Sequence, residues 1–149
     1  YSLTSNLLQL ARAYSAFANE GVMVEPKIYL EDEIIRKRVL SKFNASFILD
    51  SLRMTVLEGT ASNLKDVEVD IAGKTGTSEK YIEGVGYASE KYISSFASIF
   101  PSHTPKYIMI VSIDEPDPNK YFGGDVSAPV VAKISKFMKR LKYLWWTHF

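Results

Sequence analysis

The stretch AGKTGTS at residues 72–78 decides how this sequence is interpreted. Two glycines interrupt what otherwise has the composition of a strand, and a glycine inside a strand often marks the close approach of a ligand or of another backbone. Lys74 places a positive charge beside the hydroxyl groups of Thr75 and Thr77, and these groups together could bind a carboxylate through charge-assisted hydrogen bonds. An exposed backbone N–H near Thr77 could also stabilise a developing oxyanion.

Two other interpretations of the same stretch stay open at this point. A P-loop requires a glycine-rich loop that ends in Gly-Lys-Ser/Thr. Residues 73–75 supply that ending, but the glycine required five residues earlier is replaced by Glu68. The remaining alternative is an ordinary twisted strand whose lysine and threonines face solvent. The motif alone does not choose between a carboxylate site and this strand.

On the N-terminal side of the motif, apolar residues recur at helical spacing in two segments. The first predicts a helix over residues 5–20, capped by Thr4 or Ser5 and stopped by Gly21. The second predicts a helix over residues 42–58, with Ser41 as the N-cap and a glycine at its end. Between them, residues 22–40 are expected to form two short strands around a turn at residues 31–33.

The motif lies in the first of three predicted strands, at residues 67–78, 93–100 and 106–114. The last two are joined by a short break and are expected to be antiparallel neighbours. The apolar run in the third strand favours burial on both faces, between helices. A closing helix should begin near residues 125–129 and run to about residue 141. The residues expected in the core include Ile108, Ile110, Val130, Val131, Ile134 and Phe137.

Composition narrows the class of protein. The chain has 149 residues, 46% of them hydrophobic, which suits a globular domain or part of one. A net charge of +1 argues against nucleic-acid binding. Cysteine is absent, and the two histidines, His103 and His148, lack the spacing of a zinc site. No segment has the ~20 apolar residues of a membrane span, no signal peptide is visible, and residues 143–149 form a tail of uncertain origin.

Several segments, in order along residues 1–141, resemble the class B penicillin-binding proteins. The Lys-Thr-Gly-Thr strand is similar to the third signature of penicillin-binding proteins and serine β-lactamases. The other similar segments are LLQLARAYSAFANEG at residues 7–21, VLEGTA at 56–61, SFASIFPSHTPKYIMIVSIDEP at 95–116 and YFGGDVSAPVVAKI at 121–134. The Gly-Gly-x-Val-Ser-Ala-Pro form is most similar to the division-type, septal transpeptidase.

The resemblance implies a role for each residue of the motif. Lys74 would line the cleft, support the proton network and attract the carboxylate of the acyl donor, so it is assigned a catalytic role with Thr77. The Thr75 and Thr77 hydroxyl groups would bind that carboxylate, and the Thr77 N–H would form half of the oxyanion hole. Gly76 and Ser78 complete the substrate-binding set. Strict alternation, however, puts Lys74 on the opposite strand face from both threonines.

The other two signatures of that family are missing. The nucleophile should lie in a Ser-x-x-Lys motif, and the one match, at residues 62–65, precedes the Lys-Thr-Gly strand, where the family does not place it. A Ser-x-Asn motif is absent. We therefore expect the chain, residues 1–149, to be the C-terminal portion of a transpeptidase domain, with its nucleophile upstream of Tyr1, and to be inactive alone.

The implied fold is of the α/β (α+β) class: part of the serine β-lactamase/transpeptidase fold, with three antiparallel strands and packed helices. The implied activity of the parent is D,D-transpeptidation through a serine acyl-enzyme, without cofactor or metal. The implied partners are the peptidoglycan stem peptide, β-lactam antibiotics, the rest of the domain and cell-division membrane proteins. The implied location is the periplasmic, extracytoplasmic face of the bacterial inner membrane, with the anchor upstream. The alternatives are a D,D-carboxypeptidase or β-lactamase-like hydrolase, and a non-catalytic module that binds cell-wall peptide.

Overall fold

The computed structural model describes the backbone of residues 5–146, and the side chains of these residues except 88, 89 and 142–146. The elements in chain order are α1 (Leu7–Ala18), β1 (Val22–Val24), β2 (Arg36–Arg38), α2 (Lys42–Leu57), the 3₁₀ turn η1 (Ser62–Leu64), β3 (Ala72–Ile82), β4 (Gly86–Phe100), β5 (Tyr107–Asp114), α3 (Gly123–Val126) and α4 (Ala128–Trp146). None of the helices within residues 5–146 is long and apolar enough for a membrane span.

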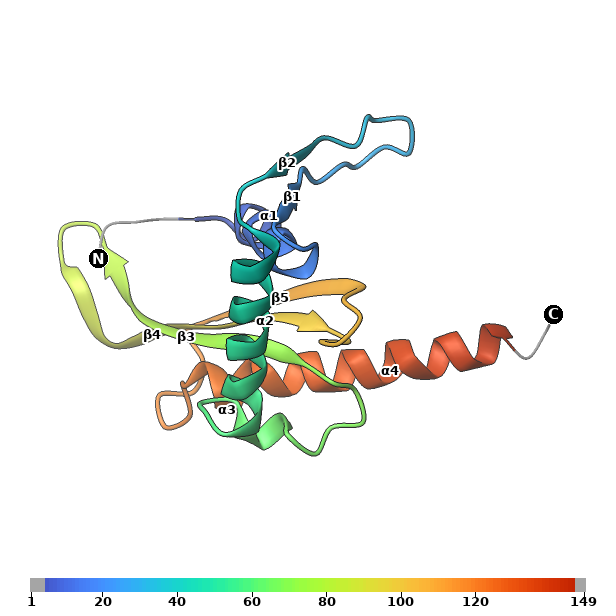
Figure 1. Ribbon diagram of the computed structural model, residues 1–149. Coiled ribbons are helices and arrows are strands. Elements are labelled where there is room, and N and C mark those ends of the chain that lie inside the picture. Colours follow the sequence, from blue (N-terminus) through green and yellow to red (C-terminus); the bar gives the residue numbers. More distant parts are fainter. Residues whose placement is uncertain (1–4, 147–149) are drawn as a thin grey trace.

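A three-stranded antiparallel sheet, in the order β3-β4-β5, forms the centre of the molecule. Helices α1 and α2 cover one face and α4 covers the other, while the separate β1–β2 hairpin extends away from the sheet (Figure 1). The α4 face holds a cluster around Phe96, Phe100 and Val131. The opposite face holds a smaller cluster around Leu52 and Ile99. Because β3 lies at an edge, the predicted motif borders open space rather than a neighbouring strand.

The helix predictions are confirmed in outline and corrected at their ends. The N-cap of α1 is Asn6 rather than Thr4 or Ser5: its side chain accepts from the Gln9 N–H, and Gln9 reaches back to the Asn6 N–H in a capping box. Gly21, at φ +88°, supplies the predicted left-handed stop. Ser41 caps α2 by accepting from the Asn44 N–H at 3.1 Å.

The first predicted strand is shifted toward the C-terminus. It starts at Ala72 rather than residue 67, because the chain first passes through η1 and a further turn in which the Val67 N–H donates to the Leu64 carbonyl. It continues to Ile82, and β4 begins at Gly86, so these two strands form a long hairpin that residues 93–100 alone did not predict. The turn expected at residues 31–33 lies between β1 and β2.

The burial predicted for two of the six expected core residues is wrong. Ile134 is 40% exposed and Phe137 is 61% exposed. Both lie on α4, whose buried residues include Val131 and Ser135, so the helix presents a neighbouring face to the sheet. Residues Ile108 and Ile110 are only half-buried because β5 is the second edge strand. The closing helix is preceded by α3 and reaches Trp146; of the predicted tail, residues 147–149 lie outside the described part of the chain.

Candidate active site

A shallow depression of about 400 Å³ lies along the open edge of β3. Three elements contribute to it: the strand itself, the turn after α2, and the start of α3. The residues that line it are Thr60, Lys74, Thr75, Thr77, Phe122, Gly123, Gly124 and Asp125. Lys74, Thr75 and Thr77, which were singled out from the sequence, therefore lie together in the depression, beside residues that are 14 to 51 positions away in the chain.

Lys74 reaches the depression around the strand edge. Alternation does start its side chain on the opposite face from Thr75, as the sequence predicts. Its Nζ nevertheless donates to the Thr75 carbonyl at 3.1 Å and lies 3.4 Å from Thr75 Oγ1. The long, flexible lysine side chain makes this contact possible from the opposite strand face.

Both threonine hydroxyl groups already have protein partners. Thr75 Oγ1 lies 2.7 Å from Thr60 Oγ1, and either oxygen can be the donor. Thr77 Oγ1 accepts a hydrogen bond from the Gly123 N–H at 3.1 Å. The two hydroxyl groups that the sequence assigns to carboxylate binding therefore also connect β3 to the turn after α2 and to the start of α3.

The backbone of Thr77 faces the open edge. In an antiparallel strand the N–H and C=O of one residue point to the same side, and the side alternates with each residue. The Thr75 carbonyl points outward, since it accepts from the Lys74 ammonium group at the strand edge. Thr77, two residues on, has the same direction, so its N–H is oriented toward whatever occupies the edge.

Glycines allow the surrounding backbones to approach one another closely. A Cβ on Gly123 would collide with the Ser95 carbonyl oxygen and would lie 2.6 Å from the Gly76 carbonyl oxygen. A Cβ on Gly124 would collide with the Thr60 carbonyl oxygen. Asn63 adds a side-chain bond, because its Nδ2 donates to the Gly124 carbonyl at 2.7 Å. The start of α3 is thereby packed between β3 and the turn after α2.

The two remaining residues of the predicted set lie beside the depression rather than in its lining. Gly76 is half-buried and leaves room for Gly123 and for the Ser95 hydroxyl group. Ser78 is exposed, pairs with Ile93 of β4 and does not line the depression.

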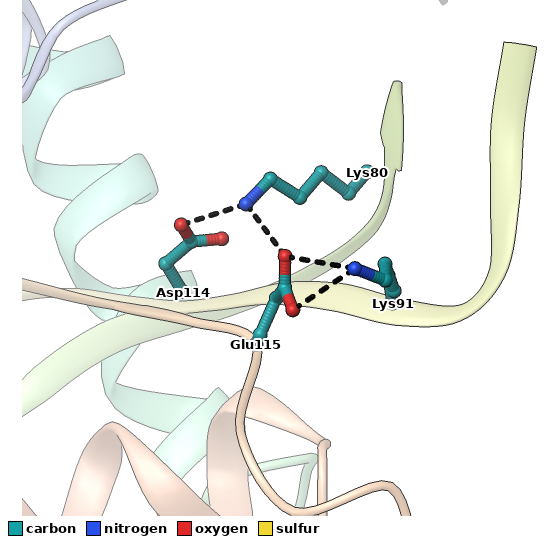
Figure 2. A network of polar contacts seen from close by, with 4 residues as sticks. All are labelled: Lys80, Lys91, Asp114 and Glu115. Atoms are coloured by element: carbon teal, nitrogen blue, oxygen red, sulfur yellow. Dashed lines mark hydrogen bonds and ion pairs between the residues drawn. The ribbon is translucent and has the colours of Figure 1, made fainter. Parts of the chain in front are cut away.

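A polar network fixes the bend of the hairpin beyond the depression. Lys80 donates to Asp114 Oδ2 and to Glu115 Oε1, both at 2.8 Å, and Lys91 donates to Glu115 Oε2 at 3.3 Å (Figure 2). The hydrogen bond to Asp114, followed by that to Glu115, raises the pKa of Lys80. Hydrogen bonds from Lys80 and Lys91 lower the pKa of Glu115. These charges tie β3 and β4 to the end of β5.

A second cluster holds the segment just before β3. Asp70 forms an ion pair with Arg53 of α2, accepts from the Ser102 hydroxyl group and lies 3.3 Å from His103 Nδ1. Burial alone would raise the pKa of Asp70, but the hydrogen bonds from Ser102 and His103 and the Arg53 charge outweigh it, and the net pKa is lowered. The cluster borders a larger hollow of about 550 Å³ beside α4, which contains none of the predicted site residues.

Metal binding receives no support from the described side chains, among which no group of three or more His, Cys, Asp or Glu residues could hold an ion. Within the depression, Asp125 is the single carboxylate in the lining. The chemistry that the depression offers is an ammonium group, three threonine hydroxyl groups and an outward backbone N–H, which suits an anionic ligand.

Comparison with known proteins identifies the family. The sequence model of the penicillin binding protein transpeptidase domain matches residues 1–136. The chain belongs to this family.

Its relatives point to one branch of the family. A peptidoglycan D,D-transpeptidase FtsI homolog of Mesostigma viride is 30% identical over 91% of this chain. The transpeptidase domain of penicillin-binding protein 3 from Burkholderia pseudomallei superposes with a TM-score of 0.79, at 34% identity over 95% of this chain. Penicillin-binding protein 3 of Mycobacterium tuberculosis complexed with ampicillin gives a TM-score of 0.77, at 26% identity over 95% of this chain.

The chain spans only part of each of these proteins: 27% of the Mesostigma protein, 44% of the Burkholderia chain and 36% of the Mycobacterium chain. The predicted fold class is confirmed by these neighbours. The sequence did not identify Asn63, which bonds the Gly124 carbonyl, or five of the residues that line the depression: Thr60, Phe122, Gly123, Gly124 and Asp125. Thr60 lies in a segment that carried the family resemblance, but nothing in its local pattern indicated a contact with Thr75.

Proposed function

We propose that the protein containing this chain is a peptidoglycan D,D-transpeptidase that also reacts with β-lactams. A serine outside this sequence attacks the penultimate carbonyl of a D-Ala-D-Ala stem peptide, and the terminal D-alanine leaves. An amine of a neighbouring strand then displaces the serine and forms the cross-link. The observation that carries the proposal is the convergence of Lys74, Thr75 and Thr77 in one depression at the open edge of β3.

The residues of this chain supply the carboxylate site and part of the oxyanion hole. The terminal carboxylate of the acyl donor would accept hydrogen bonds from the Thr75 and Thr77 hydroxyl groups beside the Lys74 charge. The outward Thr77 N–H would donate to the oxyanion that develops on the attacked carbonyl. A peptide can also align along the open edge of β3 by strand addition, which would hold the reacting carbonyl in register.

The Ser-x-x-Lys and Ser-x-Asn motifs belong to the rest of the domain, which would pack against this chain. Action on peptidoglycan places the protein at the extracytoplasmic face of the membrane. The FtsI name of the Mesostigma relative supports a division role with membrane partners. The ampicillin complex of the Mycobacterium protein supports β-lactams as ligands.

The test is the second-order rate of acylation of the full-length protein by a labelled penicillin. Lys74→Ala removes the positive charge while the nucleophile stays in place, so the rate should fall roughly ten- to hundredfold. The matched control is Lys133→Ala, which removes an exposed lysine of α4 and should leave the rate unchanged. The 149-residue chain alone should acquire no covalent label.

Two results would contradict the proposal. One is a full-length protein that folds but forms no adduct that survives denaturation. The other is a Lys74→Ala variant that is acylated as fast as the Lys133→Ala control.

A further inference from the structure

The direction of the hydrogen bonds at Thr75 and Thr77 decides whether these two hydroxyl groups can donate to an anion in the depression. A hydroxyl group has one proton to donate and two lone pairs that accept. A carboxylate can only accept, so each threonine binds it only if its proton is not already used by a protein acceptor. The partners of the two hydroxyl groups within the protein therefore determine whether they serve as donors to the ligand.

At Thr77 the direction is fixed by the backbone. The Gly123 N–H can only donate, so Thr77 Oγ1 accepts from it and keeps its own proton for the ligand. Gly123 is held in place by its neighbour, because the Gly124 carbonyl accepts from Asn63 Nδ2 at 2.7 Å. Asn63 therefore holds the Gly123 N–H in the position from which it donates to Thr77.

At Thr75 the direction depends on one other side chain. Lys74 Nζ can only donate to Thr75 Oγ1, and it lies 3.4 Å away. Thr60 Oγ1, at 2.7 Å, can either donate or accept. If Thr60 accepted, the Thr75 proton would be consumed and a lone pair would face the anion. If Thr60 donates, Thr75 accepts twice and directs its proton into the depression.

We infer that the turn after α2, residues 60–63, is a positioning element that makes both threonines donors toward a ligand carboxylate: Thr60 by donating to Thr75, and Asn63 by holding Gly123 against Thr77. The inference rests on the proposed function and extends it to residues outside the Lys-Thr-Gly strand. Neither residue needs to touch the reacting atoms. The ligand class is a β-lactam or peptide that carries a free carboxylate at this position.

The experiment compares two ligands in the full-length protein: a labelled penicillin and its methyl ester, which lacks the negative charge. Thr60→Val has the same shape as threonine without the hydroxyl group. Without the Thr60 donor the Thr75 hydroxyl group can rotate, and its proton is no longer held toward the ligand. We therefore expect the acylation rate with the acid to fall about three- to tenfold, the value of one neutral hydrogen bond, and the rate with the ester to stay near wild type. Thr60→Ser keeps the hydroxyl group and should restore the rate with the acid.

Asn63→Ala tests the second half of the inference. It removes the bond to the Gly124 carbonyl and should also lower the acid rate more than the ester rate. Thermal unfolding of each variant verifies that it folds. Should Thr60→Val not fold, the smaller Thr60→Ala takes its place with the same expected loss of preference for the acid.

The outcomes distinguish a failure of the proposed function from a failure of the positioning role. If the wild-type protein forms no adduct with the acid, the proposed function fails. If the wild type reacts but Thr60→Val and Asn63→Ala match it, or lower the acid and ester rates equally, the positioning role is wrong while the proposed function stands. A Thr60→Ser variant as slow with the acid as Thr60→Val would also overturn the role of the hydroxyl group.

Discussion

The two halves of the β3–β4 hairpin are held in place by different forces. From Ala72 to Glu79 the strands keep one register, with Lys74 opposite Ala97 and Thr77 opposite Ser94. This half is fixed by backbones that touch at glycines and by the Asp70 cluster at its base. Beyond a register shift at Glu79/Lys80 the strands continue to the turn, and the bend is held by surface ion pairs.

This difference indicates which residues can be substituted without disrupting the candidate site. Contacts between backbones cannot adjust to an added atom, whereas long charged side chains can find other partners or water. Lys74, Thr75 and Thr77 of the candidate site all lie in the first half. Substitutions should therefore have large effects around the site and small effects in the outer hairpin, and three predictions examine this contrast.

The largest effect is expected for Gly123→Ala. The added methyl group would meet the Ser95 and Gly76 carbonyl oxygens, both of which belong to the sheet. Either α3 moves away from β3 or the strands separate, and overpacking of this kind costs about 1–3 kcal/mol or more. We expect a clear fall in the thermal-unfolding midpoint of the full-length protein, together with slower acylation, because the Gly123 N–H leaves Thr77.

The matched control is a glycine of the outer hairpin. Gly84 has φ +80° and no atom within 4 Å of an added Cβ, so it needs its backbone freedom but not its small size. Gly84→Asn should change the midpoint little, since asparagine tolerates the left-handed region. Equal losses from the two substitutions would show that close packing at Gly123 is not what holds the first half.

A smaller effect is expected for Asp70→Asn at the base of the first half. It leaves the Arg53 charge without its partner and weakens the bonds from Ser102 and His103. The loss should be about 1 kcal/mol near neutral pH, because charge-assisted bonds are worth more than neutral ones but this cluster is partly screened by solvent. Unfolding midpoints measured as a function of pH provide the test.

The pH dependence has a defined sign. The folded pKa of Asp70 lies below its ordinary value of 3.8, so its stabilisation is present above that value and is lost as the pH falls through the folded pKa. The difference between wild type and Asp70→Asn should therefore be largest at neutral pH and shrink below about pH 4. His103→Ala should keep most of this acid sensitivity, since Arg53 and Ser102 remain. A difference that grew on acidification would refute the assignment to Asp70.

Local pattern was sufficient to predict much of the fold. Apolar spacing and caps predicted α1 and α2, and the AGKTGTS strand was placed in an antiparallel sheet, where it forms the edge. The burial of Ile134 and Phe137 was wrong because periodicity defines an apolar stripe but not which side of it faces the sheet. The outer hairpin was missed because its strands are largely exposed and lack an apolar alternation.

The site could be predicted only where its residues are adjacent in sequence. Lys74, Thr75 and Thr77 form one motif, and the structure brings them together. Thr60 and Asn63 join the site through bonds that span 15 and 61 residues, and such pairs arise from the packing of α3 and the turn after α2. Local patterns in a single sequence do not predict contacts between residues so far apart in the chain.

The smallest effect is expected for Lys80→Met in the outer hairpin. Methionine keeps an apolar stem of similar length and removes the charge that bonds Asp114 and Glu115 (Figure 2). These are surface pairs, and at 0.1 M salt charges are screened over about 10 Å, so the unfolding midpoint should hardly change. Because the pKa of Lys80 is raised, any stabilisation should be present below its ordinary value of 10.5 and be lost above it. Midpoints at low salt and at 0.5 M salt should differ more for wild type than for Lys80→Met. A loss as large as that of Gly123→Ala, at either salt concentration, would mean that the outer hairpin is as tightly constrained as the site and would remove the contrast between the two halves.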